Sequence, residues 1–496
     1  MTPYPKKLAI LAVTVIAALA LSACSGGGGG GSSTSTLTVG LPSEPSTLDF
    51  TSNGDAPLPL LYNVYQTLVK DDQNGKIVPS LAKSWDISDD RKTYTFHLVD
   101  TKFSNGEPFT AEDAKFSIDR VTTWKDSSKD AMAVVESTSV KDAHTLVVTL
   151  KQASNSWLFN MSSRIGVMFA KNAVNDLANK AVGTGPYTFT SWKRGDSITL
   201  TKNADYWGKK AGFDHLVFKF FKDANATNSA LLSGTINVIG LTQSPESLSQ
   251  FEHNSKYQVI EGTSNLEVLL AMNNSTGPMA NEDMRKAVKY GIDHKALLDT
   301  CFSGRGTLIG SMVPPTDPWY EDLTGKYPYD PKKAKELLAA SGEADQTIRL
   351  TVPTLPAYVG CGQVLQSQLQ QLGFKVELKQ LEFPAVWFDQ VFTNGDYDMN
   401  ITGHIQPHDL CPVFDDPKYY THYGKPAFAK LCADADAGTE ADQVKDLKQA
   451  AEMLADDAAA DWLFLLPNLI VADKDITGLP KNSTSESVDM TDAARS

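Results

Sequence analysis

The segment at residues 182–189 constrains the fold of this chain more than any other. It reads Val-Gly-Thr-Gly-Pro-Tyr-Thr-Phe, in which Gly183 and Gly185 free the backbone to turn and Pro186 fixes the next dihedral. Two stretches of alternating polar and apolar residues flank residues 193–196, a pattern that predicts a β-hairpin. A segment of this kind suits a return crossing between two lobes.

The N-terminus predicts a secretory leader. Lys6 and Lys7 precede an apolar run at residues 8–20, which is shorter than the roughly 20 apolar residues that a membrane-spanning helix needs. The tetrapeptide Leu-Ser-Ala-Cys that ends at Cys24 looks like a lipobox, in which the Cys thiol is acylated and the chain is cut before it. We expect residues 1–23 to be a lipoprotein signal peptide and Cys24 to be the lipidated N-terminus. The alternative is an ordinary signal peptide with an incidental Cys.

Length and composition indicate a globular protein with more than one lobe. The chain of 496 residues exceeds the roughly 250–300 residues at which a single core stops growing. A Gly- and Ser-rich stretch at residues 24–36 predicts a flexible tether ahead of the folded body. The net charge of -14 argues against nucleic acid or an anionic membrane surface as a partner.

Cysteines beyond Cys24 could form disulfides in an exported chain. Cys301, Cys361, Cys411 and Cys432 allow two bridges in three connectivities. Proximity along the chain favours Cys301 with Cys361 and Cys411 with Cys432, although the sequence alone does not decide among the three.

Local patterns predict alternating strands and helices. Residues 94–98 alternate as a half-buried strand, and Thr110 and Asp113 stand at the N-cap and capping-box positions of a following helix. The apolar residues within 58–70 form a helical stripe. Strand and helix patterns alternate through residues 348–401, which indicates an α/β lobe.

Separate blocks of sequence, in one order, resemble a known family. They are Phe-Ser-Asn-Gly-Glu-Pro-Phe-Thr-Ala-Glu-Asp at 103–113, the hairpin block at 182–208, and an Asn-containing strand followed by an Arg-x-Ala helix at 272–293. These blocks resemble the extracytoplasmic solute-binding proteins of ABC importers, the peptide and oligopeptide class known as family 5. The resemblance implies an α/β, periplasmic-binding-protein-like type II bilobal fold with an additional inserted lobe.

The resemblance also divides the chain into lobes. It implies a first lobe built from residues 37–78, 183–267 and 463–496, an inserted lobe at 79–182, and a second main lobe at 268–462. Chain crossings between the lobes would act as a hinge that closes on a solute.

A binding function without catalysis follows from the same resemblance. A monomeric lipoprotein, anchored through Cys24 on the extracytoplasmic face of the cell membrane, would capture di- or oligopeptides and deliver them to membrane permease subunits, with no cofactor and no nucleic acid. The sequence contains no Gly-x-x-x-x-Gly-Lys-Ser/Thr loop, no His-Glu-x-x-His and no Gly-x-Ser-x-Gly. A ligand sensor and a hydrolase with dispersed catalytic residues stay open as alternatives.

Residues 396–414 contain the candidate binding site. In peptide-binding relatives the corresponding run passes through Gly-Trp, and an Asp three residues past the Trp pairs with the α-ammonium of the ligand; here these positions are His404 and Pro407. Asp409, two residues on, is the candidate to replace that Asp. The residues expected to contact the ligand are Glu44, Trp387, Gly403, His404, Ile405 and Asp409.

Two rival ligands stay open. His404, His408 and His422 belong to a set of metal-ligating residue types, and relatives of this class include nickel and metal-chelate binders. Pro407 breaks the helix that would place His404 and His408 on one face, so exposed loop histidines are the simpler interpretation. An oligosaccharide is the second rival, because sugars stack on aromatic rings such as those of Trp387, Tyr358, Tyr419 and Tyr420.

Overall fold

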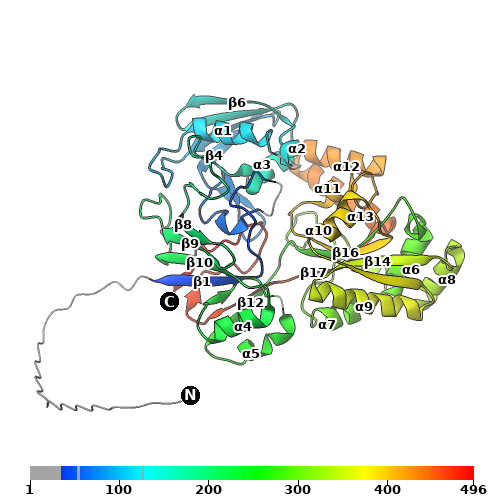
Figure 1. Cartoon of the computed structure of the whole chain (residues 1–496). Coiled ribbons are helices and arrows are strands. Elements are labelled where there is room, and N and C mark those ends of the chain that lie inside the picture. The colour runs from blue at the N-terminus through cyan, green and yellow to red at the C-terminus, as the bar shows by residue number, and fades with distance from the viewer. Residues whose placement is uncertain (1–34, 53–55, 125–127, 243) are drawn as a thin grey trace, which may run out of the picture. The chain divides into compact units, whose positions relative to one another are not determined.

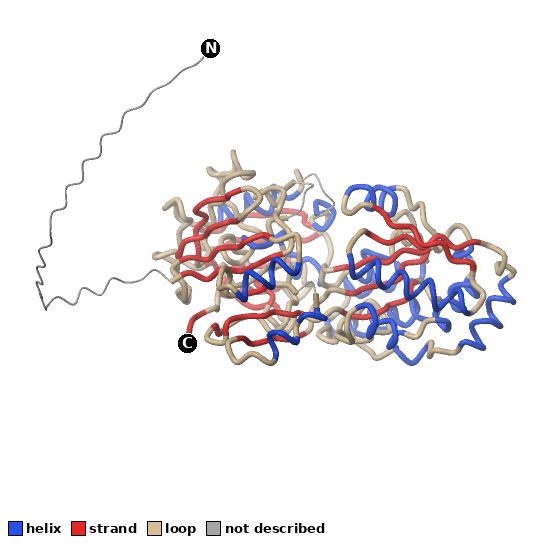
Figure 2. Tube along the Cα trace, turned by 60° about the horizontal axis from the view of Figure 1, so that its bottom comes forward, coloured by secondary structure: helices blue, strands red, loops and turns tan. Residues whose placement is uncertain are grey.

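Strands from distant parts of the chain assemble into three main sheets (Figure 1). The computed structural model describes residues 35–52, 56–124, 128–242 and 244–496, and within them the strands form seven-, five- and four-stranded sheets and two short ribbons. The predicted signal peptide, Cys24 and most of the predicted tether lie outside the described residues. Figure 2 shows the strands gathered into two groups, each with its own helices.

The seven-stranded sheet is named the β1 sheet. Its strands, in spatial order, are β12 (Tyr257–Gly262), β18 (Asn468–Asp473), β11 (Val238–Ile239), β1 (Thr36–Leu41), β10 (His215–Phe220), β9 (Ser197–Lys202) and β8 (Tyr187–Lys193). β1 pairs in parallel with β10 and β11, whereas β8 and β9 pair antiparallel. The hairpin predicted around residues 193–196 is therefore confirmed. Helices α4 (Ala224–Leu232) and α5 (Ser249–Glu252) lie beside β11 and β12.

The four-stranded sheet, named the β5 sheet, is antiparallel. Its order is β4 (Ala82–Ile87), β5 (Thr93–Leu98), β7 (Thr145–Leu150) and β6 (Val135–Asp142). Helix α1 (Ala111–Val121) packs on β6 and β7 and begins at a capping box formed by Thr110 and Asp113, as predicted. The short helices α2 (Ser128–Ala131) and α3 (Asn155–Asn160) complete this region.

The five-stranded sheet, named the β13 sheet, carries helices on both faces. Its order is β15 (Lys375–Leu381), β14 (Thr347–Pro353), β16 (Met399–His404), β13 (Glu267–Met272) and β17 (Ala460–Leu465). Alternate side chains of β13 enter two different cores, Leu270 and Met272 in one and Leu269 and Ala271 in the other. This three-layer arrangement confirms the predicted α/β architecture.

The helices of the β13 sheet are of two sets. One set is α6 (Glu282–Gly291), α7 (His294–Cys301), α8 (Pro331–Ser341) and α9 (Pro356–Gln371). The other is α10 (Ala385–Phe388), α11 (Leu410–Phe414), α12 (Pro426–Ala437) and α13 (Glu440–Asp456). Disulfides Cys301–Cys361 and Cys411–Cys432 join α7 to α9 and α11 to α12, which confirms the pairing favoured by proximity.

Short elements connect these parts. The two ribbons are β2 (Val69–Asp71) with β3 (Ile77–Pro79), and β19 (Ile476–Thr477) with β20 (Ala494–Arg495). Single turns of 3₁₀ helix occupy Leu58–Leu60, Arg164–Gly166, Pro245–Ser247, Pro278–Ala280 and Thr324–Lys326, and a π-helical turn occupies Asp389–Thr393. Within the described ranges, no helix combines the length and apolar character needed to span a membrane.

The helix predicted over residues 58–70 is wrong. The structure has one 3₁₀ turn at Leu58–Leu60, then irregular backbone, and then β2. The carbonyls of Asn63 and Val64 accept hydrogen bonds from the backbone of the 185–187 segment, and that of Gln66 accepts one from Met168. Because these acceptors are taken by distant segments, they are not available to a local helix.

This pairing also changes the interpretation of Gly183 and Gly185. Neither has a positive φ, so neither is required by turn geometry. A β-carbon on Gly183 would lie 2.0 Å from the carbonyl oxygen of Val64, and one on Gly185 would lie 2.6 Å from that of Asn63. These glycines therefore permit close backbone approach between two segments far apart in the sequence.

Polar contacts join the start of α3 to the end of α12. Asn155 Nδ2 donates to the carbonyl oxygens of Ala435 and Gly438, at 2.8 and 3.0 Å. The Ser154 hydroxyl donates to Asp436 Oδ1 at 3.0 Å. These bonds tie the region of the β5 sheet to the helices of the β13 sheet.

Candidate functional site

Four carboxylates lie buried where β2, the first residue of β13 and two loops of the β13 sheet come together. Asp71 is 4% exposed, Glu267 2%, Asp317 8% and Asp409 7%. Ionisable side chains this deeply buried are rare unless each has an ion-pair or hydrogen-bond partner or a functional role. We name this set the buried acidic cluster.

The β13–β16 pairing organises one half of the buried acidic cluster. Glu267 stands directly opposite His404 in the ladder. His404 Nδ1 lies 3.0 Å from Asp409 Oδ2, and His404 Nε2 lies 2.7 Å from the Tyr420 hydroxyl. Both imidazole nitrogens therefore face protein groups, so the ring is held in one orientation beside Glu267.

The second half is organised by His408. Its φ is +60°, and its ring lies against those of Phe159 in α3 and Trp319, with centroid separations of 3.8 and 4.6 Å. Its Nε2 atom lies 3.6 Å from Asp317 Oδ1. Side chains from both strand groups thus meet at His408.

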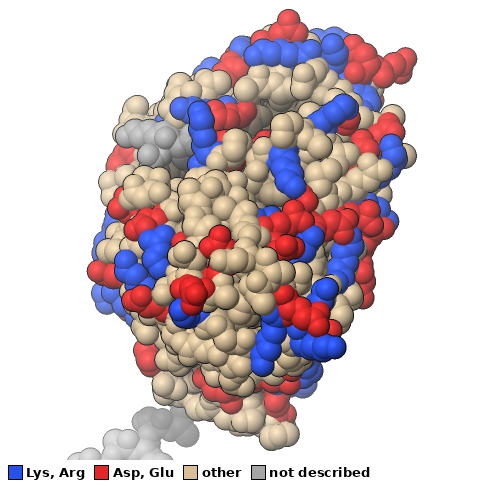
Figure 3. All heavy atoms as spheres, turned by 90° about the vertical axis from the view of Figure 1, so that its right-hand side faces the viewer, with Lys and Arg blue, Asp and Glu red and all other residues tan. Residues whose placement is uncertain are grey.

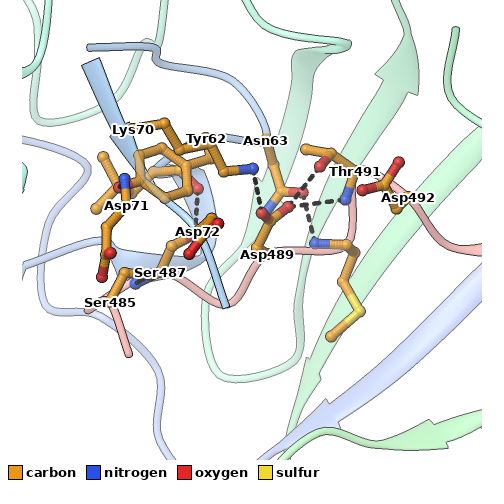
Figure 4. Close-up of polar contacts among 12 residues, drawn as sticks. Tyr62, Asn63, Lys70, Asp71, Asp72, Ser485, Ser487, Asp489, Thr491 and Asp492 are labelled. Carbon is orange, nitrogen blue, oxygen red and sulfur yellow. Dashed lines mark hydrogen bonds and ion pairs between the residues drawn. The ribbon is translucent and has the colours of Figure 1, made fainter. Parts of the chain in front are cut away.

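Asp71 belongs to this site because of the alternation of strand β2. Lys70 points to the opposite side, where its ammonium contacts the Asp489 carboxylate at 2.5 Å. Figure 4 shows the Asp71 carboxylate directed away from that pair. Neither oxygen of Asp71 accepts a hydrogen bond of ordinary geometry, because the nearby Thr484 hydroxyl donates to the carbonyl of Asp72 at 2.7 Å.

Burial and neighbouring charges perturb two members of the cluster. Burial raises the pKa of Asp71 to about 7; the charge of His408 and the nearby Thr484 hydroxyl oppose this rise, and the charges of Asp72 and Asp317 add to it. Burial also raises the pKa of Glu267 well above its usual value, and the charges of Asp409 and Asp317 add to it. Both groups therefore keep a proton to a higher pH than an exposed carboxyl group does.

The other predicted contact residues are distributed around this site. Glu44 accepts hydrogen bonds from the Trp192 indole at 2.7 Å and from the Gly195 amide at 3.0 Å, so its carboxylate braces the β8–β9 turn. Trp387 is buried among aromatic rings, and its Nε1 atom has no partner. Gly403 and Ile405 are exposed on either side of His404. Of the six predicted contacts, Asp409 is a member of the buried acidic cluster and His404 lies beside it.

The three candidate metal-binding histidines do not converge. His404 and His408 each face a carboxylate, whereas His422 Nδ1 faces the Pro417 carbonyl at 3.0 Å. The described part of the chain contains no group of three or more His, Cys, Asp and Glu side chains arranged to hold a metal ion.

Sequence reasoning did not single out Asp71, Glu267 or Asp317. Asp71 precedes a turn, where an acidic residue is ordinary, and Glu267 stands at the edge of an apolar strand. One signal was available, because the carboxylate of Glu267 directly adjoins a run of five apolar residues, Val-Leu-Leu-Ala-Met.

The outer surface has fewer features that indicate a binding site. A shallow hollow of about 330 Å³ on α7 and α9 is lined by uncharged side chains: Thr300, Gly360, Gln363, Val364, Ser367 and Gln368. Figure 3 shows acidic and basic side chains intermingled over the end of the molecule that carries the β13 sheet. That face presents no extended patch of one sign to a highly charged partner.

Comparison with known proteins finds relatives over most of the chain. The family model for bacterial extracellular solute-binding proteins, family 5, matches residues 76–427. The chain is 28% identical over 488 residues to the probable D,D-dipeptide-binding periplasmic protein DdpA of Escherichia coli K12, covering 91% of this chain and 92% of that protein.

Solved structures resemble the chain over nearly its whole length. The binding protein AgaA of A. tumefaciens R10, in complex with agropinic acid, matches 93% of this chain and 99% of its own, with a TM-score of 0.81 and 25% identity. NikA of Brucella suis, in complex with Fe(III)-EDTA, matches 93% and 100%, with a TM-score of 0.83 and 23% identity. These matches confirm the predicted bilobal fold class. The chain belongs to the bacterial extracellular solute-binding proteins of family 5 and is a substrate-binding protein of the ABC-transporter class, not an enzyme.

Proposed function

We propose that this protein captures di- or oligopeptides between its two main lobes and delivers them to the permease of an ABC importer. The observation that carries the proposal is the buried acidic cluster, whose polar groups come from β2, β13 and the loops around Asp317 and His408. The likeness to a probable dipeptide-binding protein over 91% of the chain supports a peptide in particular.

In this proposal the lobes keep the boundaries given by the resemblance. Residues 37–78, 183–267 and 463–496 form the first lobe, 79–182 the inserted lobe and 268–462 the second. A solute that touches groups on both sides favours the closed arrangement, because those contacts exist only there. The contact between Phe159 and His408 supports such closure, since it joins the inserted lobe to the second.

Lipid anchoring through Cys24 is the second part of the proposal. The supporting observation is the Leu-Ser-Ala-Cys sequence after a short apolar run. Metabolic labelling with a palmitate analogue should mark the wild-type chain and not Cys24→Ala. Labelling of both chains, or of neither, would contradict the anchor without affecting the binding proposal.

A metal chelate is the second candidate ligand, because two imidazoles belong to the site. Both face carboxylates, however, and an anionic chelate would meet the negative charge of the cluster. An oligosaccharide has less support, since two of the four rings that could stack on it, those of Trp387 and Tyr420, are buried, and those of Tyr358 and Tyr419 are only partly exposed.

Native mass spectrometry of the protein purified from its own host tests the function directly. We expect bound species whose masses and fragments are those of short peptides. Release of a chelate or a glycan instead would overturn the peptide proposal while leaving solute binding intact.

A further inference from the structure

We infer that the buried acidic cluster binds a cationic side chain of the solute, an alkylammonium or a guanidinium distinct from the α-ammonium of a peptide, and that this protein therefore selects solutes of net positive charge. Asp71 and Glu267 are assigned as the carboxylates that supply the counter-charge. The inference rests on the proposed function, in that the solute occupies the same site.

The first argument is a count of charges. Two carboxylates of the cluster lie beside imidazoles, Asp409 beside His404 and Asp317 beside His408. Asp71 and Glu267 have neither a histidine nor, among the described residues, a lysine or arginine within ion-pair distance. A buried carboxylate without a partner is costly when ionised, so these two groups remain available to an incoming cation.

The second argument is that the nearest ammonium is already committed. Lys70 precedes Asp71 in the chain but pairs with Asp489, and its ammonium also lies 4.7 Å from the centre of the Tyr62 ring. Asp489 is held further by the Thr491 hydroxyl and amide (Figure 4). Lys70 therefore does not neutralise Asp71.

The third argument is the kind of atom left without a partner. Both oxygens of Asp71, Oε2 of Glu267 and Oδ1 of Asn265 are buried and accept no hydrogen bond. Asn265 Nδ2 donates to the carbonyl of Thr484, and the Thr484 hydroxyl donates to the carbonyl of Asp72, so these acceptors belong to one region. A site with this surplus of acceptors matches an ammonium, which has three donors and no acceptor, or a guanidinium, which has five.

Aromatic rings beside the carboxylates suit the same class of ligand. Phe159 and Trp319 flank His408 next to Asp317, and the half-buried Tyr419 packs against Tyr420, whose hydroxyl lies beside His404. Ring faces attract cations, most strongly where water is excluded.

Titration calorimetry of the whole chain carrying Cys24→Ser tests the inference with defined probes. The probes are trilysine, trialanine, triglutamate and spermidine at pH 8. We expect trilysine to bind at least about tenfold more tightly than trialanine, because it can pair with Asp71 and Glu267, and triglutamate to give no binding.

Variants locate the effect. Asp71→Asn and Glu267→Gln should each weaken trilysine binding about tenfold or more and leave trialanine within about twofold. Glu377→Gln, on the exposed side of β15, removes one negative charge outside the site and should leave trilysine binding unchanged. Circular dichroism establishes that each variant is folded; if Asp71→Asn were unfolded, Glu267→Gln would carry the test.

The dependence on pH gives an independent readout. The titratable groups that face Asp71 are His408, Asp72 and Asp317, and those that face Glu267 are Asp409 and Asp317, with His404 opposite in the ladder. Trilysine binding should weaken as the pH falls from 8 to 5, because a proton competes for the carboxylates. Asp71→Asn should flatten this profile, whereas an unchanged slope would mean that Glu267 or the histidines cause it and would overturn the assignment of Asp71.

The outcomes separate this inference from the peptide proposal. Binding of spermidine without trilysine would contradict peptides and support a cation site. Equal binding of trilysine and trialanine, unaffected by Asp71→Asn, would support peptides and overturn the cation site. Failure of both cationic probes to bind would overturn it as well.

Discussion

Asp461 and Asp71 are buried to nearly the same extent, 2% and 4% exposed, but their surroundings are opposite. Asp461 lies 3.0 Å from the Lys289 ammonium and 2.9 Å from His294 Nε2. Burial would raise its pKa, yet the charges of His294 and Lys289 outweigh that effect and hold the pKa well below its usual range. Asp71 has no such partners, and its pKa rises to about 7.

The comparison shows that the contribution of a buried carboxylate to stability depends on whether a cationic partner lies beside it, and not on the extent of burial alone. Around Asp461 every neighbour supports the fold: the Lys289 ammonium also donates to the Ala460 carbonyl and lies over the Tyr327 and Trp462 rings. This group fastens α6 to β17. The carboxylate oxygens of Asp71 accept no hydrogen bond and form no ion pair among the described residues, so they join no two elements of the fold.

The largest effect should come from breaking the paired site. Asp461→Asn leaves the Lys289 ammonium buried without its counter-ion, so we expect a loss of about 3–5 kcal/mol in the free energy of unfolding. Urea denaturation at pH 7 measures it.

The pH dependence of that loss has a definite sign. Because the pKa of Asp461 is depressed in the folded state, its contribution is present above the unfolded pKa of about 4 and declines as the pH falls further toward the folded value. A loss below about 1 kcal/mol at pH 7 would contradict the distinction between the two sites.

The next effect should have the opposite sign. In the ligand-free protein, Asp71→Asn removes an unpartnered charge, so we expect a gain of about 2–4 kcal/mol in unfolding free energy at pH 8. The folded pKa of about 7 lies above the unfolded value, so the cost in the wild type grows as the pH rises from about 4 to 7 and is complete above 7. Urea denaturation at pH 8 and pH 5 should give a markedly smaller gain at the lower pH; a loss at both values would show that Asp71 is structural.

An intermediate effect is expected at the neighbouring pair. Lys70→Met leaves Asp489 without its cation, but the two side chains are 27% and 23% exposed, so solvent screens part of the cost. We expect a loss of about 1–2 kcal/mol, measured by the same denaturation assay. A loss as large as that of Asp461→Asn would mean that solvent exposure does not determine how much an ion pair contributes to the free energy of unfolding.

The smallest effect should occur on the surface. Lys295 and Asp299 pair on α7 with side chains 68% and 47% exposed. Lys295→Gln should change the unfolding free energy by less than about 0.5 kcal/mol, because exposed pairs contribute little. Thermal denaturation at low and high salt serves as the check, and a larger change would place this pair among the structural ones.

Features with nearby partners could be predicted from the sequence. The β8–β9 hairpin closes within a few residues, the capping box joins Thr110 to Asp113, and both disulfides follow proximity along the chain. The α/β alternation after residue 348 is of the same kind, since each element carries its own periodicity.

Features that depend on residues far apart in the sequence could not be predicted. The 58–70 segment is non-helical because residues near 168 and 187 take its carbonyls, and the state of Asp71 depends on Lys70 choosing Asp489, 419 residues away. For the same reason Asp409 is the one carboxylate of the buried acidic cluster that the sequence indicated as a ligand contact. Asp71 and Glu267 lack ion-pair partners within the described part of the chain because of contacts between segments that are far apart in the sequence, so no local sequence pattern predicts this.

The bonds from Ser154 and Asn155 to the end of α12 have a kinetic consequence. Asp71 and Glu267 are almost wholly shielded from solvent, so a solute that binds there as proposed could enter only when the inserted lobe and the second lobe separate and these bonds break. The association rate of the solute would then be limited by the rate at which the lobes open, even at a high solute concentration. Removing the hydrogen bonds of Ser154 and Asn155 to the end of α12 should increase both the association rate and the dissociation rate of the solute.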